Sequence, residues 1–241
     1  MANYVCSDIH GLKDRYDQMM EFIKAEDTLY ILGDVIDRGK DGIAILLDIM
    51  KRKNVIMLLG NHEYMMKQYY DAIYDHIKDP MIKQEVMTRW YMNHSASTRQ
   101  AFEQLSVTIQ EEILAFITQL PVVISDLHTK DEIYYLVHGC PIKQLHEGTW
   151  NCQDIEKQGY MVEDAIWNRI TGDEVYFHDR CVIVGHTPTL FYQSCMPYKI
   201  WYREDSCKNA NVIDIDCGCA ANNAGTQLAL FQLDNREVRY F

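Results

Sequence analysis

Carboxylates, imidazoles and a guanidinium follow short apolar runs near the start of the chain. Asp8 and His10 are two residues apart directly after the first run, so an extended backbone would direct both side chains to one side. The second run leads into the heptad GDVIDRG, in which the carboxylate of Asp34 could bridge two metal ions. Arg38 of the same heptad has the planar fork that binds a pair of phosphate oxygens. These residue types indicate a site for cations and phosphate.

A third apolar run ends in the tetrapeptide GNHE, and two more histidines follow apolar runs later in the chain. Asn61 offers a neutral oxygen to a cation, and His62 could give a proton to a departing alkoxide if it is not itself a ligand. His138 and His186 each stand beside a glycine, which leaves space for close approach of a metal ion. The other histidines lack this context and are expected to be solvated or structural: His76, His94, His128, His146 and His178.

Alternating strands and helices are expected to position the first three motifs. The pattern predicts strand, helix, strand, helix and strand over residues 3–7, 12–24, 28–32, 42–52 and 55–59. This alternation favours right-handed crossovers and a buried, largely parallel sheet. Residues 63–120 then favour helices, with breaks at Asp79-Pro80 and in the polar segment 93–97, and are interpreted as a helical insertion.

Strands return after Pro121. They are predicted over residues 122–125, 133–137, 182–184, 212–215, 227–233 and 237–240. The last two form a predicted hairpin around Asp234 and Asn235, which adds antiparallel strands to this half. Both halves fit an α/β fold (α+β in some schemes) with two mixed sheets and helices outside.

Length and composition favour one globular catalytic domain over residues 1–241. Hydrophobic residues make up 48% and charged residues 24%, as in ordinary globular proteins. The net charge of -12 disfavours a nucleic-acid partner, because proteins that grip phosphate backbones usually carry the opposite sign. No apolar run is long enough to cross a membrane, and residues 1–11 do not resemble a signal peptide. We therefore expect no membrane partner and a cytoplasmic location.

In chain order, these motifs resemble the calcineurin-like metallophosphoesterase superfamily. The segments Asp37-Arg38-Gly39 and Gly60-Asn61-His62-Glu63 are most similar to its phosphoprotein phosphatase branch, which includes bacterial and phage serine/threonine phosphatases and symmetrical diadenosine tetraphosphatases. The resemblance implies a four-layer sandwich with two mixed β-sheets flanked by helices. It also implies two divalent metal ions, with Mn or Fe expected and Zn or Ni as alternatives.

The resemblance also implies a role for each motif residue. One metal would be held by Asp8, His10 and Asp34, and the second by Asp34, Asn61, His138 and His186. A hydroxide that bridges the metals would attack phosphorus in line, without a covalent intermediate.

His62 would protonate the leaving oxygen, with Asp37 orienting its imidazole. Arg38 and Asn61 would bind phosphate, and Arg169 is the best positional candidate for a second phosphate-binding arginine.

Two positions depart from the family pattern. The segment 90–98 resembles a stretch in which Trp and Asn are followed by two glycines, but His94-Ser95 takes the place of the glycines here. Cys217 stands where bacterial members often carry Thr, in a segment expected to form a wall of the site and not a ligand. Both departures bear on the shape of the substrate cleft.

The leading hypothesis is hydrolysis of phosphomonoesters, especially phosphoserine or phosphothreonine in proteins. The alternative is a dinucleoside polyphosphate, or another small phosphorylated substrate, cleaved at the same metal core. Specificity would come from loops and from the 63–120 insertion. A nuclease or cyclic-nucleotide phosphodiesterase is disfavoured by the motif details and the acidic charge. A non-catalytic module that recognises phosphate is disfavoured because the expected ligands and proton donor are all present.

Overall fold

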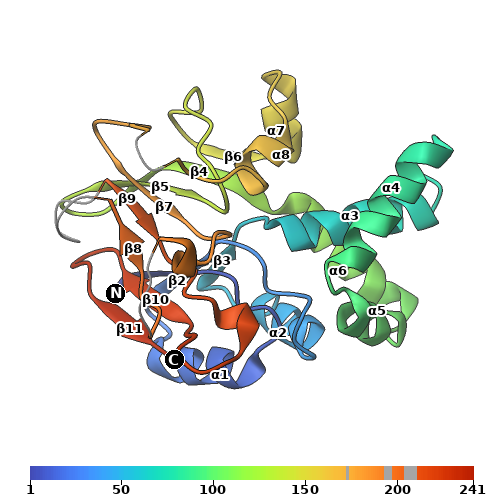
Figure 1. The fold of residues 1–241 in the computed structure, drawn as a ribbon, viewed down its shortest axis with the longest axis horizontal. Coiled ribbons are helices and arrows are strands. Elements are labelled where there is room, and N and C mark those ends of the chain that lie inside the picture. Colours follow the sequence, from blue (N-terminus) through green and yellow to red (C-terminus); the bar gives the residue numbers. More distant parts are fainter. Residues whose placement is uncertain (172–173, 193–196, 204–210) are drawn as a thin grey trace.

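Two mixed sheets with helices on their outer faces make up the computed structural model, which describes residues 1–171, 174–192, 197–203 and 211–241 (Figure 1). The first sheet has the strand order β11-β10-β1-β2-β3. Its strands are β1 (Asn3–Cys6), β2 (Thr28–Ile31), β3 (Val55–Met57), β10 (Ala229–Gln232) and β11 (Val238–Tyr240). Strands β1, β2 and β3 are parallel to one another, and β10 joins β1 antiparallel.

The second sheet has the order β6-β4-β5-β7-β9-β8. Its strands are β4 (Pro121–His128), β5 (Ile133–Val137), β6 (Thr149–Asn151), β7 (Cys181–Val184), β8 (Trp201–Tyr202) and β9 (Val212–Asp214). The central strands β5, β7 and β9 run parallel, while β4, β6 and β8 add antiparallel edges. Both sheets are therefore mixed, as the sequence predicts.

Helices link the parallel strands and cover the sheets. They are α1 (Lys13–Phe22), α2 (Gly42–Ile49), α3 (Asn61–Ile73), α4 (Pro80–Met92), α5 (Ala96–Glu103), α6 (Val107–Gln119), α7 (Cys152–Lys157) and α8 (Val162–Ile166), with short 3-10 turns at Thr189–Phe191 and Cys219–Ala221. Strand alternation explains the layers. Val5 of β1 packs in the buried cluster between the sheets, whereas its neighbours Tyr4 and Cys6 face the helices. The four-layer arrangement is confirmed.

The helical insertion consists of α3 to α6, which project to one side of the sheets (Figure 1). The predicted break at Asp79-Pro80 is confirmed: the Asp79 carboxylate accepts the N–H groups of Met81 and Ile82, and Pro80 occupies the first helical position. The first insertion helix begins at Asn61, two residues before the predicted start. Consequently two of the candidate site residues lie on the insertion itself.

Most predicted strands and helices of both halves are present, including the hairpin, in which Phe231 of β10 pairs with Val238 of β11. The elements that were not predicted are β6, α7, α8 and β8. Each has six residues or fewer. Segments this short carry too few residues for hydrophobic periodicity to reveal them.

Candidate metal centre

Loops that follow five parallel strands meet at one edge of the two sheets. The loops after β1 and β2 are joined by backbone hydrogen bonds from Asp8 to Gly33 and from His10 to Asp34. Hydrogen bonds also connect the two sheets here: the backbone N–H of His186 donates to Asp8 Oδ2 at 2.9 Å, and His138 Nδ1 lies 2.6 Å from the carbonyl oxygen of Leu32. The carboxyl ends of parallel strands face the same edge, which is why motifs far apart in sequence converge here.

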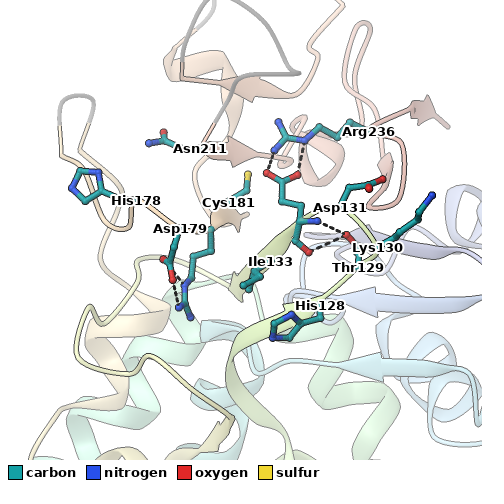
Figure 2. A pocket seen from close by; sticks show the side chains of 12 residues that line it. His128, Thr129, Lys130, Asp131, Ile133, His178, Asp179, Cys181, Asn211 and Arg236 are labelled. Atoms are coloured by element: carbon teal, nitrogen blue, oxygen red, sulfur yellow. Dashed lines mark hydrogen bonds and ion pairs between the residues drawn. The ribbon is translucent and has the colours of Figure 1, made fainter.

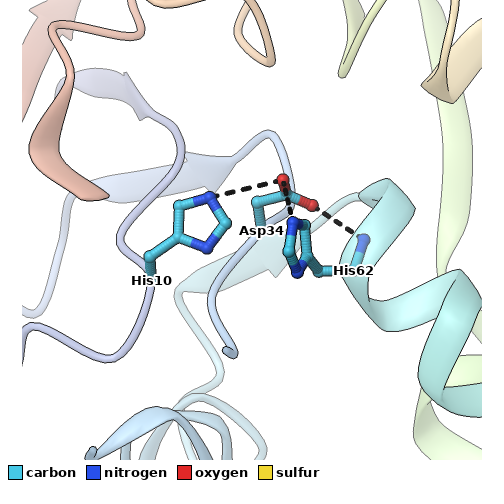
Figure 3. Close-up of side chains that lie close together, drawn as sticks. All are labelled: His10, Asp34 and His62. Atoms are coloured by element: carbon cyan, nitrogen blue, oxygen red, sulfur yellow. Dashed lines mark hydrogen bonds and ion pairs between the residues drawn. The ribbon is translucent and has the colours of Figure 1, made fainter. Parts of the chain in front are cut away.

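Asp34 lies at the centre of this cluster (Figure 3). Its Oδ2 atom is 3.5 Å from His10 Nε2, 3.8 Å from His62 Nε2 and 3.4 Å from His138 Nε2. The other oxygen, Oδ1, accepts the backbone N–H of His62 at 3.0 Å. One carboxylate thus faces imidazoles from both sheets, as a bridging ligand would.

The tautomer of His10 prepares it to bind a cation. Its Nδ1 lies 3.0 Å from the carbonyl oxygen of Ile36, which can only accept, so Nδ1 carries the proton. The opposite nitrogen, Nε2, is buried and has no hydrogen-bond partner among the described residues. It lies 3.8 Å from Asp8 Oδ1. A buried lone pair facing two carboxylates fits a metal ion, and the carbonyl partner fixes the ring orientation.

A second group of potential ligands shares Asp34. It contains Asp34, His138 and His186, whose ligand atoms lie within 4.8 Å of one another. Asn61 joins it through Oδ1, which lies 2.9 Å from His138 Nε2. Because His138 Nδ1 donates to the Leu32 carbonyl, the Nε2 lone pair and the amide oxygen converge on one point. The first group, by the same criterion, contains His10, Asp34 and His62.

The candidate residues have a strained backbone. Asp8, His10, Asp34, Asp37, Arg38 and His186 all have positive φ, between 47° and 68°. Each such conformation costs on the order of 1–3 kcal/mol for a non-glycine residue, and it persists only where surrounding contacts impose it. Strain of this kind concentrates at functional sites, so these angles support the cluster as the centre of activity.

Burial and mutual charge shift the pKa values in the cluster. Burial works against ionisation of Asp34, but the surrounding histidines hold its pKa well below the usual range. Burial alone would lower the pKa of His138, yet the neighbouring Asp34 raises it to about 9. Burial lowers the pKa of His186 to about 4. Protons and metal ions compete for such groups, so this cluster would bind cations in a pH-dependent way.

His62 makes a separate contact with Asp37. Its Nδ1 lies 2.7 Å from Asp37 Oδ2, and both side chains are buried. The same oxygen accepts the indole N–H of Trp90 at 2.8 Å. His62 therefore presents Nε2 toward the cluster while Asp37 holds the other side of the ring, the arrangement of an oriented proton donor.

The two candidate phosphate-binding arginines are both exposed. Burial lowers the pKa of His10 and works against protonation of His62, and the positive charge of Arg38 adds to both effects. Arg169 Nη1 donates to Thr187 Oγ1 at 2.9 Å, which places it beside the His186 loop. The structure thus brings both guanidinium groups to the rim, where phosphate could reach them.

A family model for calcineurin-like phosphoesterases matches residues 3–215 of this chain, the part that contains every candidate residue. The chain belongs to this family. The family depends on a dinuclear metal centre, and the two overlapping ligand groups around Asp34 agree with that requirement.

Two relatives show local sequence similarity to this family member. The symmetrical bis(5'-nucleosyl)-tetraphosphatase of Wigglesworthia glossinidia brevipalpis is 35% identical over 77 residues, which is 30% of this chain and 28% of the relative. The enzyme of the same name from Acidovorax sp. (strain JS42) is 39% identical over 67 residues, 26% of this chain and 24% of the relative. The matched part spans about a quarter of the length of these relatives.

Solved structures show the same fold at low sequence identity. A serine/threonine protein phosphatase from Saccharomyces cerevisiae has a TM-score of 0.59 and 12% identity, with 100% of this chain and 79% of that chain covered. A metallophosphoesterase from Sphaerobacter thermophilus has a TM-score of 0.53 and 15% identity, with 100% and 86% covered. At these identities the likeness concerns the fold alone.

Glu63 has a role in this family member that the sequence did not reveal. Its buried carboxylate accepts the backbone N–H groups of Asp34 at 2.9 Å, Val35 at 2.9 Å, Ile36 at 3.3 Å and Gly60 at 3.3 Å. It therefore holds the loop that carries Asp34 against the start of α3. Its place directly after His62 in GNHE was the available signal, but only the tertiary fold shows what the carboxylate binds.

The two departures from the family pattern have different structural outcomes. His94 has φ of 62°, the left-handed conformation that glycine favours, so it adopts the backbone that a glycine would supply. Cys217 is buried behind the site, after β9. Nearby Asp214 and Asp216 are also buried, and burial raises the pKa of both carboxyls well above the usual range.

A separate cavity of about 560 Å³ lies at the opposite ends of the central strands (Figure 2). Its lining includes Ile133 and Cys181, the first residues of β5 and β7, and also His128 and His178. None of the candidate site residues lines it. Among the described residues, no helix is both long and apolar enough to span a membrane.

Proposed function

We propose that this phosphoesterase cleaves a small phosphoanhydride of the dinucleoside polyphosphate type. The observation that carries the proposal is the local similarity to symmetrical bis(5'-nucleosyl)-tetraphosphatases, at 35% identity over 77 residues. The phosphoserine and phosphothreonine hypothesis stays a prediction, since the resemblance to the protein phosphatase from Saccharomyces cerevisiae concerns the fold alone. The same metal core would serve either substrate.

The proposed roles are those that the family resemblance implies, and the proximity of the side chains around Asp34 supports them. Asp8, His10 and Asp34 would hold one divalent cation, and Asp34, Asn61, His138 and His186 the other, with Mn or Fe preferred. When bound, the pair supplies Lewis acidity that activates water and neutralises phosphate charge. His62 would give its Nε2 proton to the leaving oxygen, while Asp37 keeps the ring in place at 2.7 Å. Arg38, Arg169 and Asn61 would bind the phosphate oxygens.

A cavity beside the cluster supports a substrate with more than one phosphate. It has a volume of about 350 Å³, and its walls include Gly11 and Gly39, the chain neighbours of His10 and Arg38. Lys13, Arg15 and Lys40 line it together with Asp14 and Asp41, which leaves one more positive than negative side chain. A polyphosphate chain could extend from the rim into this positively charged space.

Competing substrates test the proposal. The Mn-loaded protein is assayed with diadenosine tetraphosphate and with a phosphoserine peptide, and the products of the first are separated by chromatography. We expect kcat/KM to favour the tetraphosphate by at least about 100-fold. A symmetrical cut would give ADP as the product. The variant His62→Asn assigns any hydrolysis to this site, because a contaminating enzyme would not lose activity with it.

Two outcomes would contradict the proposal. Faster hydrolysis of the phosphopeptide would favour the protein phosphatase hypothesis in its place. Inertness toward both substrates, in protein that contains two metal ions per chain, would exclude both substrate classes.

A further inference from the structure

Asp37 receives hydrogen bonds from two helices of the insertion, from Trp90 of α4 and from His62 of α3. It is fully buried, and its Oδ2 atom accepts from His62 Nδ1 at 2.7 Å and from Trp90 Nε1 at 2.8 Å. Trp90 lies on α4 and is also fully buried, with its ring 5.0 Å from that of Tyr69. Among the described residues, the indole N–H is the one donor to this carboxylate besides His62, so the two hydrogen bonds together orient the same oxygen.

The same insertion holds the backbone of the next residues. Thr98 Oγ1 accepts the backbone N–H of Asp37 at 2.9 Å, and the carbonyl oxygen of His94 accepts the N–H of Arg38 at 3.2 Å. Ser97 Oγ donates to the carbonyl oxygen of Gly39 at 2.8 Å. Asp37 and Arg38 have φ of 68° and 63°, conformations that need such contacts to persist.

We propose that Trp90 is a positioning residue for the proton donor. The insertion would act on catalysis by holding the Asp37 carboxylate in place, so that it keeps its hydrogen bond to His62. This inference deepens the proposed function, because it rests on His62 as the general acid. Trp90 itself touches neither substrate nor metal in this arrangement. It acts through Asp37, which fixes the imidazole so that Nε2 faces the leaving oxygen.

A misplaced general acid has a specific kinetic signature. When the P–O bond breaks, the leaving oxygen takes the proton from His62 Nε2, and a leaving group that is already stable as an anion needs this proton less. Loss of this positioning should therefore slow the hydrolysis of substrates with poor leaving groups much more than the hydrolysis of substrates with good ones. Binding of the phosphate by the arginines should change little, so KM should stay nearly constant.

The test compares p-nitrophenyl phosphate, which has a good leaving group, with phenyl phosphate, which has a poor one. Trp90 is replaced by benzothienylalanine, which keeps the shape of the indole but has no N–H, and in a second protein by Phe. Thr98→Val removes the acceptor of the Asp37 N–H at nearly constant volume. Trp150→Phe is the matched control, since Trp150 is a tryptophan of β6 whose Nε1 has no hydrogen-bond partner among the described residues.

We expect the benzothienylalanine protein to lose about 10-fold or more in kcat for phenyl phosphate and less than about 3-fold for p-nitrophenyl phosphate. Thr98→Val should show the same selectivity, and Trp150→Phe should show neither loss. Metal content and thermal midpoint are measured for each protein. The indole N–H signal of Trp90, assigned by its absence in Trp90→Phe, should exchange slowly with solvent because its donor is buried.

His62→Asn separates failure of this inference from failure of the proposed function. If His62→Asn is selective for phenyl phosphate and the benzothienylalanine protein is not, the positioning role is wrong and the general acid stands. If His62→Asn itself slows both substrates equally, the general-acid role is wrong, and with it the basis of the inference. Equal losses on both substrates in the Trp90 variants would also overturn the positioning role.

Discussion

At the scale of single residues, Asp34 links the whole site. Its two oxygens reach the imidazoles of two loops and the imidazole and backbone N–H of His62 on α3. No neighbouring carboxylate occupies the same position: Asp8 contacts His10 and the backbone of His186. Removing the charge of Asp34 should therefore disturb both proposed metal positions at once. Removing the charge of Asp8 should disturb only one of them.

Asp34→Asn should lower the metal content from about two ions per chain to below about one, and kcat/KM should fall at least about 100-fold. Elemental analysis after dialysis against Mn checks the first expectation. The thermal midpoint should also stop rising with added Mn, because only a ligand that binds the folded state stabilises it. Asp14→Asn, an exposed aspartate of α1, is the control and should keep both metals. Full metal content in Asp34→Asn would contradict the bridging role.

At the scale of elements, hydrogen bonds hold the start of α3 and the loop after β2 together. Glu63 of the first turn accepts N–H groups from Asp34, Val35 and Ile36, so the helix holds the loop that carries the central carboxylate. An ionised carboxylate can accept all of these hydrogen bonds because both of its oxygens carry lone pairs and neither carries a proton. A side-chain amide in its place would direct its own NH2 group toward these backbone N–H groups, and two donors cannot form a hydrogen bond with each other.

Glu63→Gln should therefore lower the free energy of unfolding of the metal-free protein by about 1–3 kcal/mol, the cost of leaving a buried donor unpaired. Urea denaturation in the presence of a chelator measures this, so that metal loss does not contribute. Glu111→Gln, on an exposed position of α6, removes the same charge without a buried partner and should change stability by less than about 0.5 kcal/mol. Equal stability of the two variants would exclude the proposed support of the Asp34 loop.

At the scale of the molecule, the site exists only because the two sheets pack together. His10 and Asp34 follow β1 and β2 of the first sheet, whereas His138 and His186 follow β5 and β7 of the other sheet. Between the sheets, Val5, Leu136 and Ile183 belong to one buried apolar cluster. Its packing sets the separation of the two sets of ligands.

Ile183→Ala should lower the free energy of unfolding by about 2–5 kcal/mol, because it leaves a cavity in a fully buried position. We also expect one cooperative transition for the whole chain, with circular dichroism and tryptophan fluorescence coinciding, since Trp90 of the insertion belongs to a buried cluster that also contains residues of both sheets. Ile56→Ala, at a partly exposed position of β3, is the control and should cost less. Two separate transitions would contradict the single domain predicted over residues 1–241.

The sequence by itself determined the identity of the candidate residues and the elements that carry them. Asp8, Asp34 and Asn61 each follow a short apolar run that predicts a strand, and this pattern is local. The strand ends, the helical insertion and the terminal hairpin could be predicted for the same reason. The elements too short for periodicity, such as α8 and β8, could not.

Only the tertiary structure decided which of these residues meet and what supports them. His138 and His186 reach Asp34 from another sheet, across a separation in sequence that no local pattern specifies. Trp90 was recognised only as part of the segment 90–98 that resembles a family stretch, and its hydrogen bond to Asp37 follows from how the insertion folds back on the site. Local residue types decide what chemistry is available, and long-range packing decides the distances at which that chemistry can work.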